Sequence, residues 1–161
     1  MSSESKILDP DQLKAWRTTL RRDGRRLVVT NGCFDLLHAG HVSYLESART
    51  HGDALLIGLN GDDSVRQLKG PTRPVVPEQD RARVLAALGC IDAVSIFPEV
   101  RAIRFLDAAQ PDIYVKGGDY TLETINQDER QAVERHGGRI VFIPFLPGRS
   151  TSSLLDRIQR L

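Results

Sequence analysis

Short apolar stretches alternate along the chain with longer segments in which apolar residues recur every three or four positions. Turn-forming residues bound the apolar stretches, which is typical of short buried strands. The longer segments have the spacing of amphipathic helices. The predicted strands are residues 27–30, 54–59, 93–97, 113–115 and 140–144. The predicted helices are residues 10–22, 41–49, a short piece that ends at residue 68, and then 77–88, 100–109, 122–136 and 150–161.

Strands that alternate with helices favour a parallel sheet with helices on both faces. We therefore expect an α/β fold with a doubly wound, five-stranded parallel sheet. Residues 1–161 are expected to form one domain, in which residues 1–24 make an N-terminal helical extension. In such sheets a ligand binds at the carboxyl ends of the strands, where the strand order reverses.

Composition limits the possible partners. The chain is 40% hydrophobic, which is enough apolar content for one buried core. At 161 residues it is too short for two ordinary domains. The 22 basic and 21 acidic residues give a net charge of +1, so no overall field attracts nucleic acid or a membrane surface. Cys33 and Cys90 lie far apart without metal-ligand spacing, and no apolar span suits a signal or membrane segment. We expect a cytoplasmic protein that binds neither nucleic acid nor membrane.

The segment His38-Ala39-Gly40-His41 follows the first predicted strand and opens the next helix. Gly32 and Gly40 allow the backbone to approach an anion, and the helix N-terminus supplies free N–H groups. Two imidazoles can add donors beside the same anion. A lone histidine here could instead cap the helix or pack, and the pair could bind zinc, although no third ligand is suitably spaced. The combination of glycines and histidines predicts a phosphate site.

Two other segments, residues 115–120 and 147–152, should reach the same edge of the sheet as residues 30–41, and a charged loop could close over the cleft. Residues 150–152 open the last helix, where their hydroxyls either cap it or bind phosphate. Lys69 and Arg73 belong to a loop rich in proline and glycine, and are either solvated charges or phosphate ligands. Residues 116–119 follow a strand and form either a simple turn or one wall of a base or sugar site.

These segments resemble a known family. Residues 32–41 are similar to the GxFDxxHxGH signature of the cytidylyltransferase-like nucleotidyltransferases, and residues 150–152 are similar to their second signature, STT or SST. Together with residues 66–74 and 115–120, they more narrowly resemble the branch that converts D-glycero-β-D-manno-heptose 1-phosphate to its ADP form. The resemblance covers residues 25 to 160 and implies a Rossmann-like nucleotidyltransferase fold and a homodimer.

The resemblance also implies an activity and a set of site residues. The reaction would transfer AMP from ATP to the heptose 1-phosphate and release pyrophosphate, as a step in lipopolysaccharide inner-core precursor synthesis. Mg²⁺ would accompany ATP, with no dedicated protein ligand. The implied catalytic residues are His38, His41, Lys69 and Thr151. The implied nucleotide-binding residues are Asn31, Gly32, Cys33, Phe34, Gly40, Lys116, Gly117, Asp119, Tyr120, Phe145, Ser150 and Ser152. The implied substrate-binding residues are Asp35, Arg73 and Arg81.

Two departures from the family pattern bear on the nucleotide. Phe145 stands where glycerol-3-phosphate cytidylyltransferases have an arginine that is expected to recognise cytosine, and a phenyl ring can pack beside a purine without donating a hydrogen bond. This favours ATP over CTP. Arg149 replaces a small or apolar residue and is either a phosphate ligand or a surface charge. Two alternatives stay open: CTP-dependent transfer to glycerol 3-phosphate or a related alcohol phosphate, and nucleotide binding by a regulator without catalysis.

Overall fold

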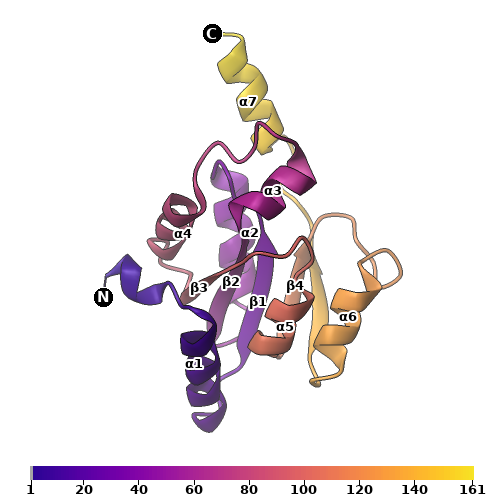
Figure 1. The fold of residues 1–161 in the computed structure, drawn as a ribbon. Helices are drawn as coiled ribbons and strands as arrows, with labels where there is room; N and C mark the ends of the chain where they lie inside the picture. Colours follow the sequence, from indigo (N-terminus) through magenta and orange to yellow (C-terminus); the bar gives the residue numbers. More distant parts are fainter. Residues whose placement is uncertain (1) are drawn as a thin grey trace.

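A computed structural model describes residues 2–161 and shows a parallel five-stranded sheet with helices on both faces (Figure 1). The strand order is β3-β2-β1-β4-β5, so the chain builds outward from β1 in one direction and then returns to build in the other. The predicted doubly wound α/β fold is confirmed. The order reverses between β1 and β4, which is where a ligand is expected. The strands are β1 (Leu27–Gly32), β2 (Ala54–Asn60), β3 (Ala93–Phe97), β4 (Ile113–Gly117) and β5 (Arg139–Ile143).

The helices divide between the two faces of the sheet. One apolar core includes Leu13 and Leu20 of α1, Phe105 of α5 and Val133 of α6. The other core includes residues of α2 and α4, such as Leu45. The last helix, α7, contains no buried residue and extends away from the body at the top of the view (Figure 1). The helices are a short 3-10 helix, η1 (Ser3–Lys6), and α1 (Pro10–Arg22), α2 (Ala39–Arg49), α3 (Asp62–Lys69), α4 (Glu78–Ala86), α5 (Ile103–Ala109), α6 (Gln127–Glu134) and α7 (Thr151–Gln159).

Aspartates fix the register at the amino edge of the sheet. Each accepts a backbone N–H from a residue within one position of the start of a neighbouring strand, and therefore satisfies a donor that the sheet leaves unpaired. The bonds run from Arg26 to Asp53 at 2.8 Å, from Leu55 to Asp92 at 2.8 Å, and from Leu27 to Asp112 at 2.7 Å. The opposite, carboxyl edge is left to the loops that form the site.

The N-terminal segment is joined to the body of the protein. Ile7 pairs with Val94 of β3 in a parallel bridge, and the N–H of Leu8 donates to the carbonyl of Val94 at 2.8 Å. The helical extension is expected for residues 1–24, of which residue 1 lies outside the described residues. Because α1 also contributes to one core, the described part of this extension packs on the sheet.

Several predicted boundaries were wrong. The helix predicted for residues 122–136 begins only at Gln127, because Thr121 and Thr124 close a separate turn and Asn126 caps the helix. The strand predicted to end at residue 115 continues to Gly117, so Lys116 belongs to β4. Lys69 closes α3 instead of lying in the following loop. Among the strands, β1 runs on to residue 32 and β5 covers residues 139–143. Among the helices, α2 begins at residue 39, α4 ends at residue 86, α5 begins at residue 103 and α7 covers residues 151–159.

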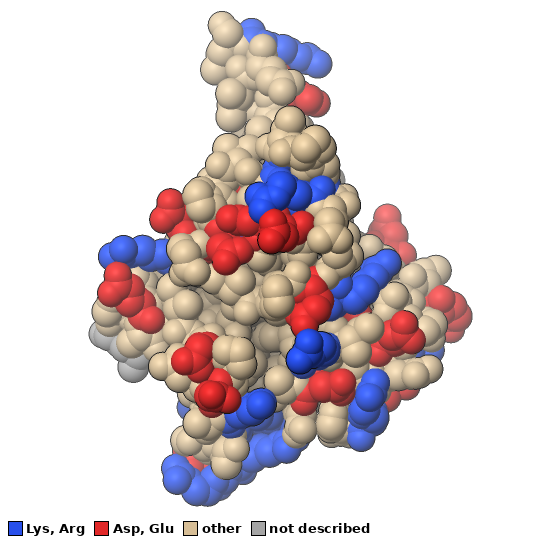
Figure 2. Space-filling model, viewed as in Figure 1, with Lys and Arg blue, Asp and Glu red and all other residues tan. Residues whose placement is uncertain are grey.

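The surface carries both signs of charge, as expected from the nearly equal numbers of basic and acidic residues. Figure 2 shows basic and acidic side chains interspersed over the viewed face. No helix within residues 2–161 has both the length and the apolar character needed to cross a membrane.

Candidate active site

A cavity of about 580 Å³ lies at the carboxyl edge of the sheet, at the reversal of strand order. Segments far apart in the sequence meet there, including the ends of β1 and β4 and the first turns of α2 and α7. The predicted site residues that line this cavity are Asn31, Gly32, Cys33, Phe34, Asp35, His38, Gly40, His41, Lys69, Arg73, Lys116, Gly117, Tyr120, Phe145, Ser150, Thr151 and Ser152. The structure does not bring Asp119 and Arg81 into the lining.

His38 and His41 cap the same helix reciprocally. His38 is the N-cap of α2, and its Nδ1 accepts the N–H of Gly40 at 3.1 Å. The Nδ1 of His41 accepts the N–H of His38 at 3.3 Å. A neutral imidazole whose Nδ1 accepts a hydrogen bond carries its proton on Nε2. Both residues therefore hold an Nε2–H donor for a ligand in the cavity.

Both imidazoles are neutral near pH 7. Burial, together with the neighbouring His38, lowers the pKa of His41 to about 4. Burial also lowers the pKa of His38, with the charge of Arg149 acting in the same direction. The helix cap and the depressed pKa values agree, since a protonated Nδ1 could not accept the backbone N–H.

The turn after β1 has an unusual backbone. Phe34 has φ of 45°, a left-handed conformation that costs a non-glycine residue about 1–3 kcal/mol. Its ring packs on Gly32, where an added Cβ would come within 3.1 Å of the ring, and on His41, with ring centroids 5.7 Å apart. The strained turn therefore brings the chain back beside the helix that the histidines cap.

Phe145 covers the end of β4. A Cβ built at Gly117 or Gly118 would lie 2.6 Å from the Phe145 ring, so glycine is required at both positions for this close approach. The ring is 65% exposed and lines the cavity. The ring of Tyr44 also lies close to Gly117, 3.0 Å from a Cβ built there, and its hydroxyl is hydrogen bonded to Thr30 at 2.7 Å. Burial raises the pKa of Tyr44 to about 12, so this hydroxyl stays protonated.

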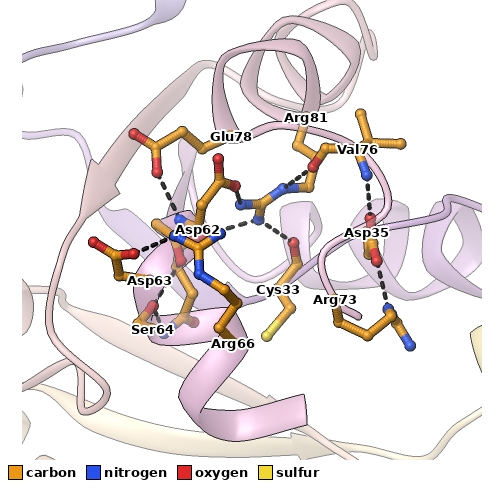
Figure 3. A network of polar contacts seen from close by, with 12 residues as sticks. Cys33, Asp35, Asp62, Asp63, Ser64, Arg66, Arg73, Val76, Glu78 and Arg81 are labelled. Carbon is orange, nitrogen blue, oxygen red and sulfur yellow. Dashed lines mark hydrogen bonds and ion pairs between the residues drawn. The ribbon is translucent and has the colours of Figure 1, made fainter. Parts of the chain in front are cut away.

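Asp35 holds the loop that follows α3 (Figure 3). Its carboxylate, 1% exposed, accepts the N–H groups of Val75 and Val76 and the Nε–H of Arg73, the last at 2.6 Å. Burial raises the pKa of Asp35, but the two backbone donors and the guanidinium outweigh it, so the pKa lies below its ordinary value. Asp35 and Arg73 both line the cavity, and their pairing fixes the position of one wall.

Arg81 has a structural role that was not predicted. Its fully buried guanidinium donates to the carbonyls of Cys33 at 2.6 Å, Asn60 at 2.9 Å and Val76 at 2.9 Å, and it pairs with Asp62 at 2.7 Å (Figure 3). These bonds tie the ends of β1 and β2 to the loop. Arg81 is predicted to contact the substrate, whereas the structure directs its donors to three backbone carbonyls and the Asp62 carboxylate.

The first turn of α7 faces the histidine turn. Thr151 donates its hydroxyl to the carbonyl of Leu36 at 3.2 Å, and Ser150 caps the helix by accepting the N–H of Ser153 at 3.1 Å. Arg149 packs beside Gly40, where an added Cβ would lie 2.9 Å from its own Cβ. The two helix N-termini therefore meet at one end of the cavity, a suitable setting for an anion.

Several lining residues were missed. Tyr44, Arg101 and Glu129 line the cavity without belonging to a motif, and Asn60 closes it at the end of β2. The strand position of Asn60 was a usable signal, since polar residues at carboxyl ends of parallel strands gather at the ligand site. Nothing local distinguishes Glu129 from other helical glutamates.

The residues present suit a metal that arrives with a nucleotide better than a resident ion. Within residues 2–161, no three His, Cys, Asp or Glu side chains are grouped to hold one. Of the two carboxylates in the cavity lining, Asp35 is saturated by three donors and Glu129 is 5% exposed and pairs with Lys116.

A doubly wound sheet with an HxGH turn and a hydroxyl-bearing helix start at its switch point defines a nucleotidyltransferase. Residues 29–153 match the family model described as cytidylyltransferase-like. The chain belongs to the cytidylyltransferase-like family.

Similar curated proteins extend this result. The chain is 50% identical over 155 residues to the bifunctional protein HldE of Syntrophotalea carbinolica, covering 96% of this chain and 31% of that protein. It is 49% identical to the bifunctional protein HldE of Geotalea uraniireducens, covering 98% of this chain and 32% of that protein. The chain spans about a third of the length of the curated relatives that it matches.

Solved structures agree on the fold. A lipopolysaccharide core biosynthesis protein from Thermoplasma volcanium is 25% identical with a TM-score of 0.62, covering 76% of this chain and 98% of that one. A pantoate–β-alanine ligase from Francisella tularensis has a TM-score of 0.61 at 15% identity, covering 96% of this chain and 72% of that one, and is similar in fold alone.

Proposed function

We propose that this chain transfers AMP from ATP to D-glycero-β-D-manno-heptose 1-phosphate, giving ADP-heptose and pyrophosphate. The product would be a precursor of the lipopolysaccharide inner core, made in the cytoplasm where ATP is available. The high identity to HldE proteins and the likeness to a lipopolysaccharide core biosynthesis protein support this assignment. The observation that carries it is one cavity lined by both His38 and His41 at one helix start and by Phe145 over the glycines of β4.

The nucleotide would bind across the switch point. Phe145 and the strand end at Gly117 offer a flat apolar surface for adenine, and Phe145 has no donor for a cytosine carbonyl. Lys116, Tyr120 and Asp119 would complete the base and sugar walls, although Asp119 lies outside the cavity lining.

The phosphates would lie between the two helix N-termini. Backbone N–H groups at the start of α2 and α7, with the hydroxyls of residues 150–152, suit the β and γ phosphates. The His38 and His41 Nε2–H groups would donate to the α-phosphate.

The reaction would be an in-line displacement. A sugar 1-phosphate oxygen attacks the α-phosphorus, the bond from that phosphorus to the bridging oxygen breaks, and pyrophosphate leaves with the electron pair. The nucleophile is already an anion at neutral pH, so no general base is needed, and catalysis rests on positioning and charge stabilisation. Two neutral donors fit this role, because they stabilise the growing charge on the α-phosphate without a proton transfer. Mg²⁺ on the ATP phosphates would neutralise part of their charge.

Lys69 and Arg73 are the candidates for the sugar phosphate. Lys69 is exposed at the end of α3 and forms no ion pair with another residue in the described range 2–161. Arg73 uses its Nε on Asp35, which leaves its terminal nitrogens free to bind a phosphate.

The test measures pyrophosphate release with the heptose 1-phosphate and each nucleoside triphosphate in turn. We expect turnover with ATP. Turnover with CTP and glycerol 3-phosphate, but not with ATP and the heptose phosphate, would overturn the proposal in favour of a cytidylyltransferase. Binding of ATP without pyrophosphate release from any sugar or alcohol phosphate would identify a nucleotide-binding regulator.

We also infer a homodimer formed through α7. Leu154 and Ile158 of this helix line a groove of about 370 Å³ together with Leu36 and Val84. Val84 and Ile158 are 51% and 57% exposed. A nine-residue helix is marginal in water on its own, so a second copy would supply the burial that α7 lacks. Light scattering should give the mass of a dimer for the wild type and of a monomer for Ile158→Glu, and a monomeric wild type would refute the dimer.

A further inference from the structure

A nearly buried carboxylate lies in the wall of the anion-binding cavity. Glu129 of α6 is 5% exposed, although it lines a cavity that is otherwise rich in donors and positive charge. A negative charge near the proposed phosphate site opposes anion binding, and burial of an ionised carboxylate is costly unless it is paired. A carboxylate in such an unfavourable position indicates that Glu129 has a function there.

Three donors converge on the Glu129 carboxylate, one from the start of α5 and two from β4. Its Oε1 accepts the N–H of Ala102, the N-cap of α5, at 3.0 Å. Its Oε2 lies 3.9 Å from the Nζ of Lys116 and 3.5 Å from the hydroxyl oxygen of Tyr114. Its own backbone N–H is bound by the Asn126 side chain at 3.0 Å, which fixes the start of α6.

Tyr114 extends this cluster to the end of β1. It is fully buried, and its hydroxyl donates to Oδ1 of Asn31 at 2.5 Å. Because Oδ1 of Asn31 is occupied as an acceptor, the amide group of Asn31 is left as a donor in the cavity that Asn31 lines. The single proton of this hydroxyl goes to Asn31, and Glu129 makes a second, longer contact of 3.5 Å with the same hydroxyl. Glu129 therefore acts on Asn31 through the position of Tyr114.

Lys116 is held from several sides. Its Nζ lies 5.5 Å from the ring centroid of Tyr114 and 5.6 Å from that of Tyr120, within the range of cation–π attraction. Burial lowers the pKa of Lys116, the charge of Glu129 raises it, and the charge of Arg101 lowers it. The carboxylate therefore preserves a positive charge that burial and Arg101 oppose.

We propose that Glu129 is a positioning residue that fixes the Lys116 ammonium and, through Tyr114, the Asn31 amide for the nucleotide. This role rests on the proposed function, because Lys116 and Asn31 act on the nucleotide only there. Glu129 does not touch the reacting atoms; it acts through the two donors that it orients.

The first test is Glu129→Gln, which keeps the size of the side chain and an acceptor for Ala102 but removes the charge. We expect KM for ATP to rise about tenfold, the loss of one charge-assisted contact, with little change in kcat. The defect should increase with pH, because Lys116 loses its proton at lower pH in the variant. Glu134→Gln is the matched control on the same helix, since Glu134 has the partly exposed Arg130 as its ion-pair partner among residues 2–161.

Two further measurements keep the inference independent of turnover. In lysine NMR without nucleotide, the pKa of Lys116 should fall in Glu129→Gln and stay unchanged in Glu134→Gln. Tyr114→Phe should weaken ATP binding in calorimetry without moving the Lys116 titration, because it removes only the link to Asn31. An unchanged Lys116 titration together with wild-type ATP affinity in Glu129→Gln overturns the inference. A wild type without pyrophosphate release overturns the proposed function, whereas the lysine titration still decides the role of Glu129.

Discussion

The rings of His38 and His41 lie 4.0 Å apart, and each accepts a backbone N–H through Nδ1. The helix cap therefore selects the tautomer of both imidazoles and leaves two Nε2–H donors side by side. The hydrogen bonds that cap α2 therefore also leave the Nε2–H groups of both histidines available to a phosphate.

Replacing His38 should separate catalysis from capping. His38→Asn keeps an N-cap acceptor for Gly40 but loses the distant donor. We expect kcat to fall about 100-fold or more, because a donor to the developing charge is worth most in the transition state. The Kd of ATP, measured by calorimetry, should change little. His38→Ala should show the same kinetic loss and an additional loss of stability of about 1 kcal/mol from the missing cap. Equal losses in kcat and in ATP affinity for His38→Asn would contradict the transition-state role.

The depressed pKa of His41 should make stability depend on pH. As pH falls below 6.5 the unfolded chain takes up a proton on this histidine, whereas the folded protein does not until about pH 4. The free energy of unfolding should therefore decrease as pH falls from 6.5 to 4, and His41 should add no dependence at higher pH. The variant His41→Gln keeps the capping-box acceptor at the third helical position and cannot titrate. Urea unfolding at several pH values should show a shallower acid loss for this variant, and a slope equal to that of the wild type would exclude the effect.

Phe145 should govern affinity for the nucleotide base. Because its ring is 65% exposed, Phe145→Ala should leave the melting temperature nearly unchanged. The variant should raise KM for ATP roughly tenfold with little change in kcat, since the lost stacking acts on bound substrate and transition state alike. Phe145→Trp should retain ATP affinity because it preserves a flat aromatic surface. Wild-type KM in Phe145→Ala would show that the base binds elsewhere.

The sequence predicts those parts of the site that depend on local chemistry. The glycines and histidines of residues 32–41 follow a strand and open a helix, so their location at the ligand edge follows from the α/β pattern alone. Glu129 could not be found in this way, because its role depends on contacts with β4 and α5 that no local pattern records. The buried network of Arg81 could not be predicted for a similar reason: an arginine at a helix start looks the same in the sequence whether it is solvated or buried. The predicted helix start at residue 122 is wrong, and the helix begins at residue 127, because Thr121 and Thr124 form a turn that competes with the helix.

Lys69 should act on the sugar phosphate without contributing to stability. It is exposed at the end of α3 and has no ion-pair partner among residues 2–161. Lys69→Ala should raise KM for the sugar phosphate about tenfold, as expected for one lost charge-assisted contact. Its melting temperature should match that of the wild type. Gln67→Ala is the control, because Gln67 is exposed on the same helix and does not line the cavity. A marked drop in melting temperature for Lys69→Ala alone would assign the lysine a structural role.

Arg81 should contribute to stability far more than its neighbour on the same helix. Arg81→Met removes the buried guanidinium and leaves the carbonyls of Cys33 and Asn60 and the carboxylate of Asp62 without this donor. We expect a loss of about 3–5 kcal/mol in the free energy of unfolding, the range for breaking a buried charged network. Arg83→Met is the matched control, because the Arg83 side chain is 64% exposed and its ion-pair partner in the described part of the chain is the similarly exposed Glu4. Its loss should stay below about 0.5 kcal/mol. Urea unfolding measures both variants. If Arg81→Met kept wild-type stability and lost only affinity for the sugar phosphate, Arg81 would be a substrate ligand after all.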